Sequence, residues 1–528
     1  MHQDVTPEVL AGLAWYYLLA SALNAAASGY VAYHEMVAEG ASREGLAPRT
    51  RRFPEWLSLA VVGLYGAALV TVPFRWLLPG GLTVAYGLAS LANGLLALTA
   101  GADAAHFAEV HGSSGTQADE TAGGGPSLDD HVPAVGLGGP INRTLWSLVW
   151  SVVAVVFQAI GLTYFFKGPL ILPRFVRAGV DYAAGPTTVF LGATLLFAAV
   201  VAFRRVFAGG LVAFGIVDLA LLAFGLSLTD ADFREIVAKP DNVPIVGLIV
   251  LVAGFTWFAL RRAVINDARR EADLPVLEAL EPDKVLTWPD LVYTELICMV
   301  ALTLFLIVWA VVLPAPLEQP AKATEAPNPS KAPWYFLGLQ EMLVYFDPWL
   351  AGVAFPSLII LGLCAIPYID ANKEGSGYYT IAARPFAYVV FLFGFLVLWI
   401  VLIVLGTFLR GPNWNFFGPY ERWEPHKVVP LNNVDLSDLV WVRALGRAKP
   451  SWALLREAPG LALLAFYLLA LPPVLLRTVF QDYRARAGLT RSLTTVVLLL
   501  MMAALPLKMI LRWTLNLKYV IAIPGFNI

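Results

Sequence analysis

Residues 385–408 read PFAYVVFLFGFLVLWIVLIVLGTF, an apolar run without one charged side chain. A helix needs roughly 20 mostly apolar residues to cross the hydrocarbon core of a bilayer, and this run is long enough. Residues 385–408 therefore predict a transmembrane helix.

The composition of the whole chain indicates that lipid solvates most of it. Of its 528 residues, 58% are hydrophobic and only 14% are charged, and the mean hydropathy is +0.69. Soluble globular proteins carry about 25% charged residues, so this composition disfavours a soluble fold. The net charge of -2 argues against a nucleic-acid partner, which would need a concentrated basic face.

The same length criterion predicts an all-α, polytopic membrane protein with about twelve transmembrane helices. The N-terminal segment lacks a basic region and a small-residue cleavage site, so we expect it to remain as the first helix. The pair Arg204 and Arg205 allows residues 186–228 to be divided differently. The predicted spans are 9–31, 57–77, 81–101, 144–166, 186–203, 208–228, 243–262, 293–314, 352–369, 385–408, 458–476 and 492–511.

Basic residues predict which side of the membrane each loop faces. Arginines gather in the loop after the first span and at 204–205, 261–270 and 477–491, and these sites fall on one side by parity. Cytoplasmic loops carry the excess of Lys and Arg, so both termini are expected on the outer, periplasmic side. The acidic, Gly-rich loop 102–142 and the basic loop 409–457 oppose this assignment, but long loops follow the rule poorly.

Polar segments divide the predicted spans into modules. Residues 263–290 are mostly polar and are predicted to be a cytoplasmic linker after a seven-helix module of unknown role at 1–262. A membrane unit at 291–408, an aromatic-rich outer loop at 409–457 and a two-helix extension at 458–528 are predicted to follow.

No set of side chains in the sequence suits a haem or a metal ion. A bis-histidine haem needs facing histidines at membrane depth, and no histidine lies in the middle of an apolar run. His34 and His106 lie at helix ends, where a histidine is usually wetted. Cys298 and Cys364 form no CxxC motif and are expected to be small core residues. We therefore expect this chain to bind no haem and no metal by itself.

Two carboxylates fall within or near predicted spans. Asp218 stands alone in LVAFGIVDLALLAFG, and an ionisable group inside a membrane is costly enough to suggest a role. Proton handling and a hydrogen-bonded packing role both stay open for Asp218. Glu295, near the inner end of its span, fits either an interfacial carboxylate or a site.

Residues 331–346, KAPWYFLGLQEMLVYF, interrupt the spans with a different pattern. Pro333 suits the first turn of a helix, and a short helix is predicted from Trp334 to about Phe346, over 334–346. It is too short to cross the bilayer, so it should lie at the outer membrane surface, where aromatic rings gather.

On this helix Trp334, Glu341 and Tyr345 are predicted to share one face, at about 100° per residue. An apolar slot lined by rings, with one carboxylate and one amide, suits the head group of a quinol. The rings would hold the plane of the head group, and the carboxylate would take a hydroxyl proton. An interfacial helix with a satisfied glutamate is equally consistent with these residues.

Four features follow one another around this helix: a polar lead into a span, a Pro-rich outer loop, a span with a Pro-Tyr-Ile-Asp exit, and a span after Arg384. The first three read KVLTWPDLVYTELICMVALTLFLIVWAVV, PAPLEQPAKATEAPNPSKAPWYFLGLQ and AFPSLIILGLCAIPYID. In this order they resemble the C-terminal half of cytochrome b, which stands alone as subunit IV in cytochrome b6f-type complexes. The resemblance covers residues 284–408.

The signature of that family at its quinol-oxidation site is Pro-Glu-Trp-Tyr, whereas this chain reads Ala332-Pro333-Trp334-Tyr335. Pro333 takes the place of the glutamate that carries the quinol proton. We expect Glu341, about two helical turns further on, to substitute for it as the catalytic proton acceptor. The quinol-binding residues that the resemblance implies are Pro333, Trp334, Tyr335, Phe336, Gln340 and Glu341.

The resemblance implies a membrane subunit of a bc-type quinol:cytochrome c oxidoreductase in an energy-transducing cell membrane, such as the bacterial inner membrane. Its substrate would be menaquinol or ubiquinol. Its partners would be a haem-bearing subunit equivalent to the N-terminal half of cytochrome b, a Rieske iron–sulfur protein and a cytochrome c, in a dimeric complex. The b-haems and the iron–sulfur cluster would belong to these partners.

Two other functions stay open. A twelve-helix secondary transporter is compatible with the number of spans, although the two halves show no matching repeat. A non-catalytic assembly subunit is compatible with the loss of the motif glutamate at Pro333. Residues 410–441, dense in rings and turns, either cover the quinol slot, help to dock a cytochrome c domain or form a structural cap.

Overall fold

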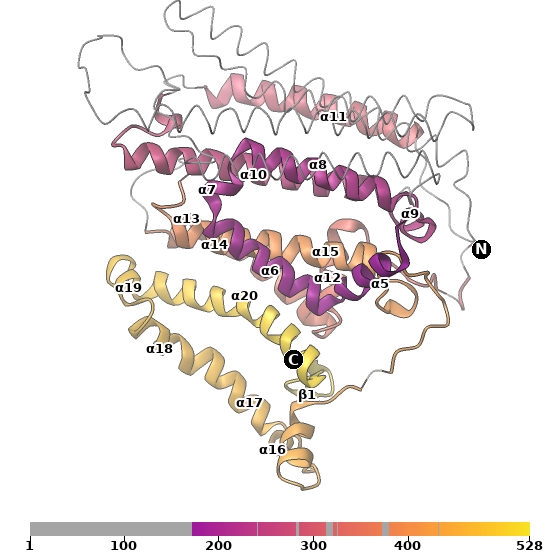
Figure 1. The fold of residues 1–528 in the computed structure, drawn as a ribbon. Coiled ribbons are helices and arrows are strands. Elements are labelled where there is room, and N and C mark those ends of the chain that lie inside the picture. The colour runs from indigo at the N-terminus through magenta and orange to yellow at the C-terminus, as the bar shows by residue number, and fades with distance from the viewer. Residues whose placement is uncertain are drawn as a thin grey trace, which may run out of the picture.

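The computed structural model describes residues 172–239, 241–280, 285–312, 320, 322–324, 326–371, 380–430 and 432–528. These residues form helices joined by turns, with one antiparallel hairpin of β1 (Ala522–Ile523) and β2 (Phe526–Asn527) (Figure 1). The prediction of a helical protein is confirmed for this part of the chain. The predicted spans 9–31, 57–77, 81–101 and 144–166 and the loop 102–142 lie outside the described residues.

Six helices in the described part are long and apolar enough to cross a membrane. A seventh crossing results if α5 (Arg174–Ala183) and α6 (Pro186–Ala202), which are bent by 79°, form one broken span. The chain is therefore a multi-pass membrane protein, and the total of about twelve spans stays a prediction. The six are Val243–Glu271, Thr287–Val312, Leu350–Ile369, Pro385–Leu409, Ala458–Arg477 and Leu489–Leu515.

Several spans join α-helical and π-helical segments end to end. The span Pro385–Leu409 consists of α14 (Pro385–Leu392), η4 (Phe393–Ile400), α15 (Val401–Val404) and η5 (Leu405–Leu409). The remaining elements are α7 (Arg204–Phe207), α8 (Gly210–Ser227), α9 (Ala231–Val237), α10 (Val243–Glu271), η1 (Leu277–Leu280), η2 (Thr287–Leu291), α11 (Val292–Val312), α12 (Trp334–Met342), η3 (Leu350–Ala354), α13 (Phe355–Ile369), η6 (Pro412–Trp414), η7 (Asp438–Ala444), α16 (Ala453–Arg456), α17 (Ala458–Ala465), η8 (Phe466–Ala470), α18 (Leu471–Arg477), α19 (Gln481–Ala487) and α20 (Leu489–Leu515).

The best-packed region lies where α12, the span Pro385–Leu409 and α20 meet, and Met342, Leu402 and Met509 are buried there. Small residues let membrane helices approach closely. A Cβ atom added at Gly406 in η5 would lie 3.2 Å from the carbonyl oxygen of Leu337 in α12. The short helix is therefore seated directly against the backbone of the neighbouring span.

The helix α12 is shorter than predicted. It ends at Met342 and not near Phe346, because the N–H groups of Leu343, Val344 and Tyr345 bond to carbonyl oxygens three residues earlier, in turns. These turns direct the rings of Tyr345 and Phe346 into the core, where they are 1% and 5% exposed.

The segment predicted to be a linker begins as helix. The span predicted to end at 262 continues as α10 to Glu271, and Ala263, Val264 and Asn266 are buried. Asp267 explains why this part is ordered: its Oδ1 atom accepts the backbone N–H groups of Ile381 and Ala382, both at 2.9 Å.

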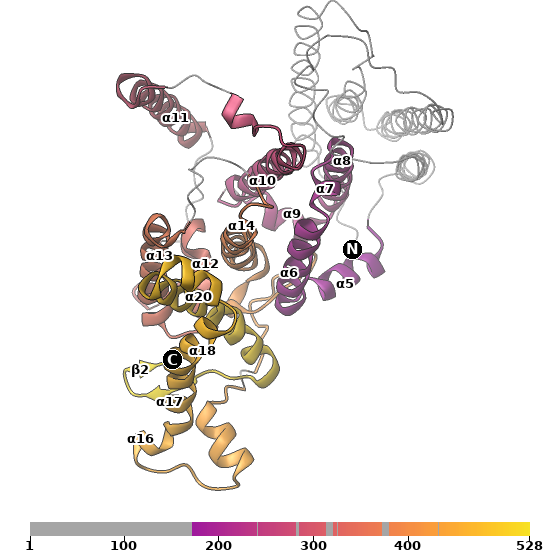
Figure 2. The same ribbon diagram turned by 90° about the vertical axis from the view of Figure 1, so that its left-hand side faces the viewer.

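The span containing α11 lies apart from the other described helices (Figure 2). No residue of α11 is buried among the described residues. Cys298 on α11 and Cys364 on α13 are both exposed, so the expectation that they are core residues is wrong. In a membrane protein an apolar run also turns side chains toward lipid, which explains the error.

Candidate functional site

The side chain of Gln340, within α12, holds the loop that leads into this helix. Pro333 precedes the helix, at φ -51° and ψ 147°. The Oε1 atom of Gln340 accepts the N–H of Ala332, and its Nε2 atom donates to the carbonyl oxygen of Ser330, both at 2.8 Å. Both ends of the Gln340 amide thus fasten the preceding loop to the helix.

Three aromatic side chains on α12 remain exposed. Trp334, Tyr335 and Phe336 are 39%, 47% and 50% exposed, and the centres of neighbouring rings lie 5.6 Å and 4.6 Å apart. Leu337 and Met342 of the same helix are 3% exposed. Buried side chains therefore anchor the helix, while the three successive rings at its start stay partly exposed. We call these rings the ring surface (Trp334, Tyr335 and Phe336).

Glu341 is separated from the ring surface. Its side chain is fully buried and is bound at both oxygens by Arg410, at 2.9 Å from Nε to Oε2 and 2.7 Å from Nη2 to Oε1. The hydroxyl of Tyr345 donates to Oε1 at 3.4 Å. The predicted common face thus brings Glu341 and Tyr345 together, whereas Trp334 lies at the exposed start of the helix.

Arg410 is a residue that sequence reasoning missed. It follows η5 directly, and its Nη1 atom also donates to the carbonyl oxygen of Trp414 at 3.0 Å. Two-pronged contacts between guanidinium and carboxylate are among the strongest hydrogen bonds in proteins. The sequence does contain a feature that singles out Arg410, because it is the first charged residue after the long apolar run 385–408.

Lys331, just before α12, is a second cationic side chain, after Arg410, at the C-terminal end of the span Pro385–Leu409. Its Nζ atom donates to the carbonyl oxygen of Thr407 at 2.6 Å and lies 4.7 Å from the centre of the Trp423 ring. Burial lowers the pKa of Lys331 to about 7, with Lys239 adding to this effect and Asp241 and Glu341 opposing it. The hydroxyl of Thr407 is buried and has no hydrogen-bond partner among the described residues.

The other predicted candidates do not join this cluster. Asp218 belongs to α8, but its side chain is not among those described. Glu295 is exposed in the first turn of α11. His426 is exposed as well, and the other five histidines lie outside the described residues. Within the described part, no three His, Cys, Asp or Glu side chains gather in a way that could hold a metal ion.

The fold and this site together define a multi-pass helical membrane protein with a short aromatic helix docked beside the end of a span. Residues 320–419 match the family described as cytochrome b (C-terminal)/b6/petD, which confirms the resemblance for this segment. The match includes α12, both partners of the ion pair between Glu341 and Arg410, and the two spans between them, Leu350–Ile369 and Pro385–Leu409. It indicates a subunit of a bc- or b6f-type complex. No solved structure matches the chain.

Proposed function

We propose that this chain is a membrane subunit of a bc-type quinol:cytochrome c oxidoreductase and forms part of its outer quinol-oxidation site. The observation that carries the proposal is the ring surface, half-exposed at the start of a helix that buried side chains anchor, inside the segment that matches the cytochrome b family. A flat quinol head group binds well between apolar rings that are already held in place.

Each residue of the predicted site has a distinct part in this proposal. Trp334, Tyr335 and Phe336 would contact the head group of menaquinol or ubiquinol. Pro333 and Gln340 would set the shape of the entrance, because Gln340 ties the loop to the helix.

Glu341 was predicted to be the proton acceptor, but its contacts favour positioning. Both of its oxygens already accept from Arg410, so Glu341 could take a quinol proton only after this pair separates.

Electron transfer in this proposal belongs to partner subunits. A haem-bearing subunit equivalent to the N-terminal half of cytochrome b and a Rieske iron–sulfur protein would each take one electron, and a cytochrome c would carry electrons onward. This chain would supply the wall of the pocket and move protons outward, in a dimeric complex of a bacterial inner membrane.

Purification of the complex through a tag on this chain tests the proposal. We expect b-type haem absorbance to copurify, and we expect quinol:cytochrome c turnover that inhibitors of the quinol site block. The double variant Tyr335→Ala/Phe336→Ala should lower turnover strongly while the haem content stays unchanged. A preparation without haem or turnover would contradict the proposal and would favour a transporter.

A non-catalytic subunit of the same kind of complex is the second candidate. The observation that favours it is that Pro333 stands at the motif position while Glu341 is fully engaged by Arg410. Under this alternative the haems would still copurify, but the Tyr335→Ala/Phe336→Ala variant would turn over at the wild-type rate.

A further inference from the structure

None of the predicted quinol-site residues, all of which the structure describes, offers a carboxylate or amine that is free to take a proton. Pro333 has no acidic group, the Glu341 carboxylate is closed by Arg410, and the Gln340 amide is bound at both ends to the backbone. Oxidation of a quinol releases protons as well as electrons, so a group that takes a proton has to stand close to the head group.

Lys331 stands closest along the chain to the ring surface among the lysines of the described part. It lies three residues before Trp334, and the loop that carries it is fastened to α12 through Gln340. The ammonium is held between the Thr407 carbonyl at the end of η5 and the Trp423 ring. Neither contact requires a charge on Lys331, because a neutral amine keeps two N–H groups and can still donate to the Thr407 carbonyl oxygen.

From this placement we infer that Lys331 is the group that accepts the proton of the bound quinol, in place of the missing motif glutamate. The inference rests on the proposed function of the ring surface. The hydroxyl O–H bond of the quinol breaks, and its proton passes to the lone pair of the Nζ atom. One electron leaves at the same time to the iron–sulfur acceptor of a partner subunit.

The charges around Lys331 suit this role. Burial is the main cause that lowers its pKa to about 7, and Lys239 acts in the same direction. Asp241, which pairs with Lys239 at 3.0 Å, and Glu341 oppose the shift. A base works best when its pKa lies near the working pH, since it is then both unprotonated and strong enough. The Trp423 ring would stabilise the ammonium that forms.

The pH dependence of turnover in the purified complex tests the inference. The wild-type rate should rise with pH through about 7 and level off above it, because Lys331 must lose its proton before it can accept another. Lys331→Arg keeps a cation and a donor for Thr407, but a guanidinium does not lose its proton. We expect this variant to lose about 100-fold or more in turnover, together with the rise near pH 7.

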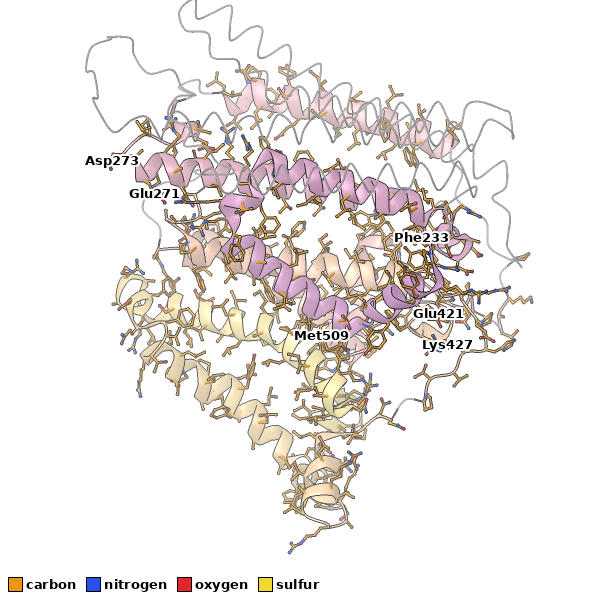
Figure 3. All side chains as sticks on the ribbon, in the orientation of Figure 1. Phe233, Glu271, Asp273, Glu421, Lys427 and Met509 are labelled. Carbon is orange, nitrogen blue, oxygen red and sulfur yellow. The ribbon has the colours of Figure 1, made fainter. Side chains whose placement is uncertain are left out.

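Lys427→Arg is the matched control. The Nζ atom of Lys427 also donates to a backbone carbonyl, that of Phe416 at 2.9 Å, and lies 4.3 Å from the Phe417 ring. It differs in having a carboxylate partner, Glu421, next to it in the same loop (Figure 3). This control should keep the wild-type rate and pH profile.

Haem content and inhibitor binding distinguish failure of the inference about Lys331 from failure of the proposed quinol site. If Lys331→Arg keeps the wild-type rate and pH profile in a complex whose wild-type form is active and inhibitor-sensitive, the role of Lys331 is overturned and the quinol site stands. A wild-type complex without inhibitor-sensitive turnover would overturn both. Loss of turnover in Lys331→Arg with unchanged haem content and inhibitor binding supports the inference.

Discussion

At the scale of single residues, the pair Glu341–Arg410 dominates the site. Glu341 is fully buried and the Arg410 side chain is 11% exposed, so neither charge is well solvated. Removal of one partner from a buried ion pair leaves an uncompensated charge, which costs about 3–5 kcal/mol. The pair therefore makes the seat of α12 sensitive to changes at either end.

We expect Arg410→Met to lower the stability of the complex by about 3–5 kcal/mol, because it leaves the buried Glu341 carboxylate without a cationic partner. The double variant Glu341→Gln/Arg410→Met should recover much of the loss, since no charge stays buried. Thermal unfolding midpoints of the single and double variants measure the coupling. Strictly additive losses would show that the two side chains do not interact.

At the scale of elements, α12 is seated by close backbone approach as well as by charge. Gly406 leaves the space that the Leu337 carbonyl oxygen occupies, and a Cβ atom there would meet this oxygen at 3.2 Å. Overpacking at such a contact has to move the short helix, and with it the ring surface. The position of three exposed rings thus depends on one glycine of the neighbouring span.

Gly406→Val is expected to destabilise the complex by about 1–3 kcal/mol and to lower quinol turnover. Gly352→Val is the control, because a Cβ atom at Gly352 would meet nothing within 4 Å. Unfolding midpoints and turnover rates measure both effects. Equal behaviour of the two variants would refute the importance of the close approach.

At the scale of the whole molecule, Asp267 connects the first part of the chain to the cytochrome b-like part. It is 4% exposed on α10, and it accepts two N–H groups of the loop that leads into α14. Hydrogen bonds to a charged group contribute more than neutral ones, about 1.5–3 kcal/mol. A carboxylate from one region therefore sets the start of a span in the other.

Asp267→Ala should speed hydrogen exchange of the Ile381 and Ala382 amides, because both lose their acceptor. Asp482→Ala, at an exposed position in the first turn of α19, should leave these amides unchanged. Exchange measured by mass spectrometry on peptides that cover 380–384 follows both variants. Unaltered exchange in Asp267→Ala would mean that other contacts hold this loop.

The sequence predicts the apolar spans well, because length and hydropathy alone decide whether a helix can cross a bilayer. The span predicted at 385–408 is found at Pro385–Leu409. The end of α12 and the partner of Glu341 are harder to predict, since Arg410 is distant in sequence and the turns after Met342 depend on packing of Tyr345. The exposed cysteines show the same limit: hydropathy does not distinguish a side chain facing lipid from one facing protein.

The ion pair between Glu341 and Arg410 couples the orientation of two elements. It fastens the aromatic helix to the end of the span Pro385–Leu409, so the two elements reorient together. Spans tilt to adapt to the thickness of the surrounding bilayer. We therefore expect the thickness of the bilayer, set by lipid chain length, to change the angle at which Trp334, Tyr335 and Phe336 face a neighbouring molecule.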